Sequence, residues 1–203
     1  RRDLSDADTH RIEALLLDTE TEIRRLALET LARRPDRVQE ETIRQALQDP
    51  TDEVRAVAVE LAARRGAVTQ SASLLVARDW PRTHRAVLRL LPETVSAAPI
   101  DDEAMRRVLE AVGDLDSGPQ ANERPAIAQL ALAMGSRRVL EALSWPDVPR
   151  LGAIRLLSHD RSPVVLRELA KHSSDPIDEI REAAAAAIDE ILQAESNREH
   201  VPA

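Results

Sequence analysis

The sequence predicts an all-α protein, and three observations support that prediction. Only 1% of the 203 residues are aromatic, whereas β-sandwiches and barrels draw heavily on aromatic and β-branched side chains. Leu, Ala, Arg and Glu dominate instead, and all four are strong helix formers. The third observation is internal self-similarity at a spacing of about 31 residues, which is typical of stacked helical repeats.

The repeat is clearest between residues 23–29 and 54–60. Ile-Arg-Arg-Leu-Ala-Leu-Glu in the first segment aligns with Val-Arg-Ala-Val-Ala-Val-Glu in the second, 31 positions later. Weaker copies include His84, Arg150 and Arg181. In proteins with such a period each repeat contacts only its neighbours, and the stack buries one continuous core. The sequence therefore predicts a single repeat domain over residues 1–203.

Within each period, apolar residues recur every three or four positions, which indicates helices. We expect twelve helices in about six antiparallel pairs. The first helices of the pairs are expected near 7–17, 36–48, 67–78, 100–112, 136–144 and 162–173, and their partners near 20–34, 51–65, 81–91, 122–135, 147–158 and 176–194. Prolines stand at or near many of these starts, where the missing N–H matters least. An irregular insertion is expected near 113–123.

The last predicted helix, near 176–194, is strongly acidic on one side. Residues 175–199 carry eight acidic and two basic side chains, and apolar positions such as Ile180, Ala184 and Ile191 mark the other side. Terminal repeats need a polar outer face. We therefore interpret this helix as an acidic C-terminal cap, with a docking surface as the alternative.

Residues 46–58, Ala-Leu-Gln-Asp-Pro-Thr-Asp-Glu-Val-Arg-Ala-Val-Ala, resemble the short HEAT-like repeats first noted in phycobilisome lyases. Further copies lie at 16–27 and 174–181, and the resemblance is poor over 95–145. The segment 156–167 also fits, only half a period before the last copy, so the pairing of helices near residue 160 stays open. The resemblance implies a right-handed α-solenoid.

In such repeats the Asp of the motif caps a turn, and the Arg about six residues later is expected to reach the Asp of its own or a neighbouring repeat. The resemblance therefore implies a structural ladder along the stack. Its members are the pairs Asp18/Arg24, Asp49/Arg55, Asp79/Arg85 and Asp175/Arg181. An anion-binding arginine stripe is the alternative interpretation of the same residues.

The two tryptophans are the only distinctive side chains. Trp80 and Trp145 each precede a proline and lie 65 residues apart, which is about two repeats. Each indole could pack against the first turn of its own helix. Because Trp is enriched at interaction hot spots, the pair is also our candidate interface along one edge of the stack.

Catalytic and ligand motifs are absent from the sequence. The lack of Cys excludes disulfides, thiolate metal sites and cysteine nucleophiles. Residues 113–118 place two glycines at P-loop spacing, but Pro119 and Gln120 replace the required Lys and Ser/Thr. The same stretch fails as a calcium loop at Pro119 and Pro125. The five histidines form no i, i+4 pair; they are His10, His84, His159, His172 and His200. We predict no catalytic residue, no metal ligand and no cofactor.

The charge balance bears on the partner. The net charge is −8, which disfavours binding to a phosphate backbone. Paired arginines at 33–34 and 64–65, with Arg37, are expected to complement helix dipoles rather than to form a nucleic-acid site. No run of about 18 apolar residues exists, so no membrane span is expected, and a cytoplasmic location is the default. The 27 Arg against one Lys are typical of a GC-rich, bacterial-like genome.

The most consistent prediction is a non-catalytic scaffold or adaptor that binds another protein along the solenoid. Two alternatives follow from the resemblance. One is a bilin lyase-like enzyme subunit that handles tetrapyrroles, and the other is a nucleic-acid-binding protein akin to the HEAT-like alkylpurine DNA glycosylases. The absence of Cys and the scarcity of aromatics disfavour the first, and the acidic balance disfavours the second. The identity of the partner and the oligomeric state stay open.

Overall fold

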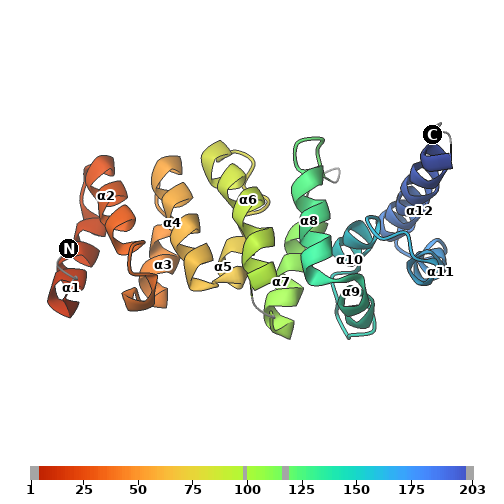
Figure 1. The fold of residues 1–203 in the computed structure, drawn as a ribbon, viewed down its shortest axis with the longest axis horizontal. Helices are drawn as coiled ribbons and strands as arrows, with labels where there is room; N and C mark the ends of the chain where they lie inside the picture. The colour runs from red at the N-terminus through yellow and green to blue at the C-terminus, as the bar shows by residue number, and fades with distance from the viewer. Residues whose placement is uncertain (1–4, 98–99, 116–118, 200–203) are drawn as a thin grey trace. The chain divides into compact units, whose positions relative to one another are not determined.

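The computed structural model of the chain describes residues 5–97, 100–115 and 119–199. These ranges contain twelve α-helices, two short 3₁₀ helices and no β-strand (Figure 1). The all-α prediction is confirmed. The chain divides into two compact units, Arg1–Ile100 and Asp101–Ala203, and the single-domain interpretation stays a prediction.

Unit 1 is a stack of helix pairs. Its helices are α1 (Asp6–Ala14), α2 (Thr21–Leu31), α3 (Glu40–Ala46), α4 (Asp52–Arg65), α5 (Val68–Ala72) and α6 (Pro81–Ala97), with 3₁₀ helices at Leu15–Leu17 and Pro35–Arg37. Helices α2, α4 and α6 lie side by side, and α1, α3 and α5 each pack against the helix that follows (Figure 1). This repeated arrangement is that of an α-solenoid.

Unit 2 is also built from packed helices, but one of its pairs is not made of helices that are consecutive in the sequence. Its helices are α7 (Asp102–Gly113), α8 (Arg124–Met134), α9 (Ser136–Ala142), α10 (Arg150–Leu157), α11 (Pro163–His172) and α12 (Asp178–Glu199). Helix α10 lies between α7 and α12, α9 packs on α10, and α11 packs on α12. The main neighbour of α7 is therefore α10 and not α8, which follows it in the sequence. The sequence predicted that the helix near 100–112 pairs with the helix near 122–135, and the structure instead pairs the first of these with α10.

Small residues let the stacked helices approach closely. Ala58 of α4 and Ala184 of α12 are fully buried, as their place in the repeat predicts. The closest approach is at Gly152 of α10, where a Cβ would lie 1.8 Å from the carbonyl oxygen of Leu109 in α7. Gly113, at the end of α7, faces Gly152 across the same contact, and its Cβ would lie 3.2 Å from the Gly152 nitrogen. The backbones of α7 and α10 thus touch directly.

Helix α6 continues beyond the residue at which the sequence predicts its end. Pro92 lacks an N–H and clashes with the preceding turn, which favours an end near residue 91. The helix instead runs to Ala97 with Pro92 inside it. Leu91 and Val95 are buried on either side of the proline. Since the apolar face continues across Pro92, burial outweighs the loss of one helical hydrogen bond.

The predicted insertion near 113–123 corresponds to the connection between α7 and α8. Glu123 is buried at its end, and one of its carboxylate oxygens accepts a hydrogen bond from the Gln120 N–H at 2.7 Å. Residues 116–118, which belong to the rejected phosphate and calcium motifs, lie outside the described residues, as does His200.

Candidate functional site

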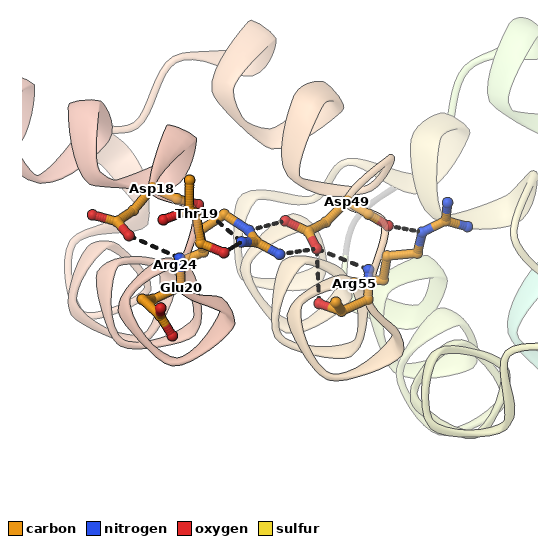
Figure 2. Close-up of polar contacts among 7 residues, drawn as sticks. Asp18, Thr19, Glu20, Arg24, Asp49 and Arg55 are labelled. Atoms are coloured by element: carbon orange, nitrogen blue, oxygen red, sulfur yellow. Dashed lines mark hydrogen bonds and ion pairs between the residues drawn. The ribbon is translucent and has the colours of Figure 1, made fainter.

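Arg24 links two successive turns of unit 1 (Figure 2). Its Nε and Nη2 donate to the carboxylate oxygens of Asp49, at 2.8 and 3.1 Å, across 25 positions of sequence. Its Nη1 donates to the carbonyl oxygens of Asp18 and Thr19, at 2.9 and 3.1 Å. Both Arg24 and Asp49 are buried. One guanidinium therefore fixes its own turn and the Asp of the next repeat.

Asp49 also shapes the turn in which it lies. One of its carboxylate oxygens accepts hydrogen bonds from the Thr51 N–H at 2.9 Å and the Thr51 hydroxyl at 2.8 Å, and its carbonyl oxygen accepts one from Arg55 Nε. Burial alone would raise the pKa of Asp49, but hydrogen bonds from Arg24 and Thr51 outweigh it, so the pKa lies below its ordinary value.

The same pattern recurs in unit 2. Arg150 Nη1 lies 2.5 Å from a carboxylate oxygen of Asp175, again 25 positions ahead, and Arg181 Nη1 donates to the Asp175 carbonyl at 2.7 Å. The Ile177 N–H donates to Asp175 at 3.1 Å. We call this arrangement a rung: an Arg binds the carbonyl six residues before it and the carboxylate 25 residues after it. Arg24 makes both halves.

The structure does not bring Asp79 and Arg85 together. Both are exposed, and in the described part of the chain no hydrogen bond or ion pair joins them. Near the start of their helices, the backbone N–H groups of Arg24 and Arg55 donate to the carbonyl oxygens four residues earlier. At the start of α6 the same kind of bond is made by His84, whose N–H donates to the Trp80 carbonyl oxygen at 2.8 Å. His84 therefore occupies in α6 the place that Arg24 and Arg55 occupy in α2 and α4. His84 is buried whereas Arg85 is not. A register shift of one residue therefore places Arg85 outside the rung.

Both tryptophans lie under arginines of a neighbouring helix. The Arg55 guanidinium carbon is 3.9 Å from the Trp80 ring centroid, and that of Arg106 is 5.3 Å from the Trp145 centroid. Arg106 also donates to the Pro146 carbonyl at 3.1 Å. Both indoles are half-buried. Each tryptophan thus helps hold its turn to the preceding stacked helix, and its role in an interface stays a prediction.

Two arginines bind the carbonyl ends of neighbouring helices. Arg64 Nη1 donates to the Ala32 carbonyl at the end of α2, at 2.9 Å. Arg155 Nη1 donates to the carbonyls of Val112, Gly113 and Leu115, between 2.7 and 2.9 Å, where α7 ends. The first belongs to the paired arginines that the sequence assigns to helix dipoles. The second was missed, because its partners lie about 40 residues away and follow no repeat spacing.

A groove of about 400 Å³ lies between α10 and α12 in unit 2. We call it the α12 groove. Its lining from α12 is Glu179, Glu182, Ala183, Ala186, Ala187 and Glu190. The opposite side consists of Leu151, Arg155, Ser158 and His159, together with Pro119 and Arg124 before and at the start of α8. The groove is therefore floored by small side chains and rimmed by carboxylates.

The carboxylates of the α12 groove are unpaired. Glu179, Glu182 and Glu190 make no ion pair or side-chain hydrogen bond with any residue that the structure describes, whereas Arg155 on the facing helix is engaged with three carbonyls. Burial lowers the pKa of His159; Glu190 acts in the opposite sense and Arg124 in the same sense. The lowered pKa favours the neutral form of His159. Three carboxylates line the groove against the guanidinium groups of Arg124 and Arg155, so the groove keeps an excess of one negative charge.

From the sequence we interpreted this helix as an acidic cap, with a docking surface as the alternative, and predicted no groove beside it. The pattern that could have revealed the groove is the spacing of Glu179, Glu182, Ala186 and Glu190, which places them along one side of a helix. What the sequence could not supply was the facing wall, because α10 precedes α12 by a whole repeat. Figure 1 shows α10 and α12 as neighbours in unit 2.

Across residues 5–97, 100–115 and 119–199, no group of three or more His, Asp or Glu side chains is placed to hold a metal ion. No helix within those ranges combines the length and the apolar character needed to cross a bilayer.

Comparison with known proteins gives structural likeness only. No protein family matches the chain, and no curated protein matches it. Among solved structures it is similar to an engineered protein from a structural genomics consortium, with 18% identity, 92% of this chain and 97% of that one covered, and a TM-score of 0.40. It is also similar to a designed armadillo repeat protein, with 15% identity, 89% and 98% covered, and a TM-score of 0.38.

The stacked helix pairs and the recurring rung decide the class. The chain has a helical repeat fold. The rung spacing of 25 residues occurs in both units, so this repeat protein uses one device at both ends to fix the distance between successive repeats.

The buried carboxylates predict acid sensitivity. The pKa of Asp175 is lowered, chiefly by the hydrogen bond from Ile177, and that of Asp49 is lowered against its burial. A carboxylate whose pKa is lowered by folding stabilises the fold at pH values above its unfolded-state pKa of about 3.9. This stabilisation is lost as the pH falls through the lower pKa of the folded state. We expect the urea midpoint to hold steady from pH 7 to 5 and to fall between pH 4 and 3. Asp49→Asn should show a smaller fall over that interval, and an equal fall would contradict the assignment.

Proposed function

We propose that the chain is a non-catalytic scaffold of the HEAT type that holds a positively charged segment of another protein in the α12 groove. The observation that carries the proposal is the row of three unpaired carboxylates along an alanine floor. Helical repeats leave long surfaces between their helices available to partners, and this groove is one of them.

The chemistry of the groove favours lysine or arginine side chains. Ala183, Ala186 and Ala187 project little, so a bound segment can approach α12 closely. The alkyl stems of Lys or Arg would cover this floor while their charged ends meet Glu182 or Glu190. The net charge of −8 adds long-range attraction, which raises the rate of association with a basic partner.

Neither alternative function gains support from a specific contact. The acidic groove is opposite in sign to what a phosphate backbone requires. The two indoles, in a chain without Phe or Tyr, are partly covered by arginines, so they are not arranged to clamp a pigment. A protein segment therefore remains the partner that the groove fits best.

The test uses two labelled peptides, octa-arginine and octa-glutamate, with fluorescence anisotropy on the full chain. We expect octa-arginine to bind with an affinity that falls as salt rises, and octa-glutamate not to bind. Glu182→Gln with Glu190→Gln should weaken binding by roughly tenfold, since each removes one exposed ion pair worth up to about 1 kcal/mol.

The matched control is Glu40→Gln with Glu41→Gln on α3. It changes the net charge of the chain by the same amount in unit 1, where both residues pair with Arg44. This control should bind octa-arginine nearly as well as the unmodified chain. Equal weakening by the two double variants would show that net charge, and not the α12 groove, attracts the peptide, and the proposal would fail.

A further inference from the structure

The first repeat exposes aliphatic side chains more than the second repeat does at the same positions. Leu15, Ile23 and Leu26 are 44%, 37% and 48% exposed. The residues 31 positions after Leu15 and Ile23 are Ala46 and Val54, which are 7% and 1% exposed. Because α4 packs on α2, the first repeat helps to cover Val54 of the second. In the first repeat, Leu15 and Ile23 at the same positions keep more than a third of their surface exposed.

Asp18 lacks half of the rung. Asp49 and Asp175 each receive a guanidinium from the Arg 25 positions earlier. Asp18 keeps the local part of the pattern, because its carboxylate accepts the Glu20 N–H at 2.8 Å and its carbonyl binds Arg24. No guanidinium of the described residues binds its carboxylate, which points away from Arg24 in Figure 2.

We propose that Leu15, Ile23, Leu26 and Asp18 form a docking surface for one further helical repeat, whose second helix carries aliphatic side chains and an arginine that binds the Asp18 carboxylate. We call this surface the end face. Leu15 and Ile23 match residues that are buried within the stack, and Leu26 matches the half-buried Val57. The free carboxylate of Asp18 complements the guanidinium that every completed rung supplies.

The end face belongs to unit 1, and the α12 groove belongs to unit 2. The two surfaces share no residue, so either proposal can fail alone. A stacked repeat would lengthen the array of helices, whereas a basic segment would bind in the α12 groove without lengthening it.

The repeat spacing allows a direct test by grafting. A copy of residues 36–66 is fused directly to the N-terminal side of Ser5 and replaces residues 1–4. The copied Arg55 then stands twelve positions before Ser5 and 25 before Asp18, which is the rung spacing. Since stability in repeat arrays grows with each stacked interface, we expect the melting temperature to rise by about 4 °C or more and amide exchange in α2 to slow.

Three variants show whether the gain comes from the end face. Asp18→Asn and Arg55→Ala in the copied repeat should each remove part of the gain, and together no more than either alone. Leu26→Asp should leave the native chain nearly unchanged and abolish the gain in the grafted one. Leu132→Asp, at a residue 78% exposed on α8, is the matched control and should keep the gain.

Two outcomes would overturn the proposal. One is a graft that changes neither the melting temperature nor exchange in α2, and the other is a gain that survives both Leu26→Asp and Asp18→Asn. If sedimentation shows self-association of the native chain that the graft abolishes, then a second copy supplies the stacked repeat, and the end face is its docking surface.

Discussion

Gly152→Ala is expected to destabilise unit 2 by about 3 kcal/mol. The new methyl would stand 1.8 Å from the Leu109 carbonyl oxygen and 2.7 Å from its carbon. Both atoms belong to the backbone of α7, so no rotamer change can relieve the clash and the helices must separate. A loss of stability would itself point to the close contact, because Gly→Ala inside an ordinary helix stabilises the helix by about 1 kcal/mol. Urea unfolding followed by circular dichroism measures the effect.

Gly113→Ala provides the graded comparison at the same contact. Its methyl would meet the Gly152 nitrogen at 3.2 Å, a distance that a small shift of the helix end can accommodate. We expect a loss well below that of Gly152→Ala. A Gly152→Ala protein as stable as the unmodified chain would mean that α7 and α10 do not touch through their backbones.

Arg24→Ala is expected to destabilise unit 1 by about 3 kcal/mol, the cost of breaking a buried ion pair from one side. Asp49, which is only 8% exposed, would lose both hydrogen bonds from its guanidinium partner. The carbonyls of Asp18 and Thr19 would lose a donor as well. Thermal and urea unfolding of the variant should agree on the loss.

Arg55→Ala is the matched control, since it removes the same side chain one repeat later. Arg55 is half-buried, and its contacts are the Asp49 carbonyl and the face of Trp80. We expect a loss of about 1 kcal/mol. Asp49→Asn on the Arg24→Ala background should recover part of the stability by removing the stranded charge. Equal losses for the two arginine variants would mean that Arg24 forms no buried rung.

The helices were predictable from the sequence, and so was the pairing of an Arg with the Asp six residues before it at Asp18, Asp49 and Asp175. Periodic apolar residues place α2, α4 and α12 within a few residues of their observed bounds, because burial of one face dictates that pattern. The resemblance to HEAT-like repeats implied that Arg24 and Asp49 belong to one ladder. The sequence left open whether each Arg serves its own repeat or the next, and the structure shows Arg24 serving both.

The unpredicted features are those that depend on a single residue or on a contact outside the repeat period. At the start of α6, a shift of one position puts His84 in the place where the sequence predicted Arg85. Arg85 lies 30 residues after Arg55 and His84 lies 29 after it, and the repeat spacing in the sequence is too variable to decide between the two. The contact of α7 with α10 spans two intervening helices, so no local pattern encodes it. The α12 groove escaped prediction for the same reason, because its two walls come from different repeats.

The rung also determines where the chain tolerates insertions and deletions. Between Arg24 and Asp49, and between Arg150 and Asp175, the count of 25 residues is fixed by a side chain of constant reach, so adding or removing one residue there would pull the guanidinium out of register. No rung of the described residues crosses residues 86–149. Within that stretch, changes of length should accumulate among related chains in the connections between helices, such as the one between α7 and α8, and not inside α7, whose backbone contacts α10. Such a connection is where an engineer should insert a foreign loop or a fluorescent tag.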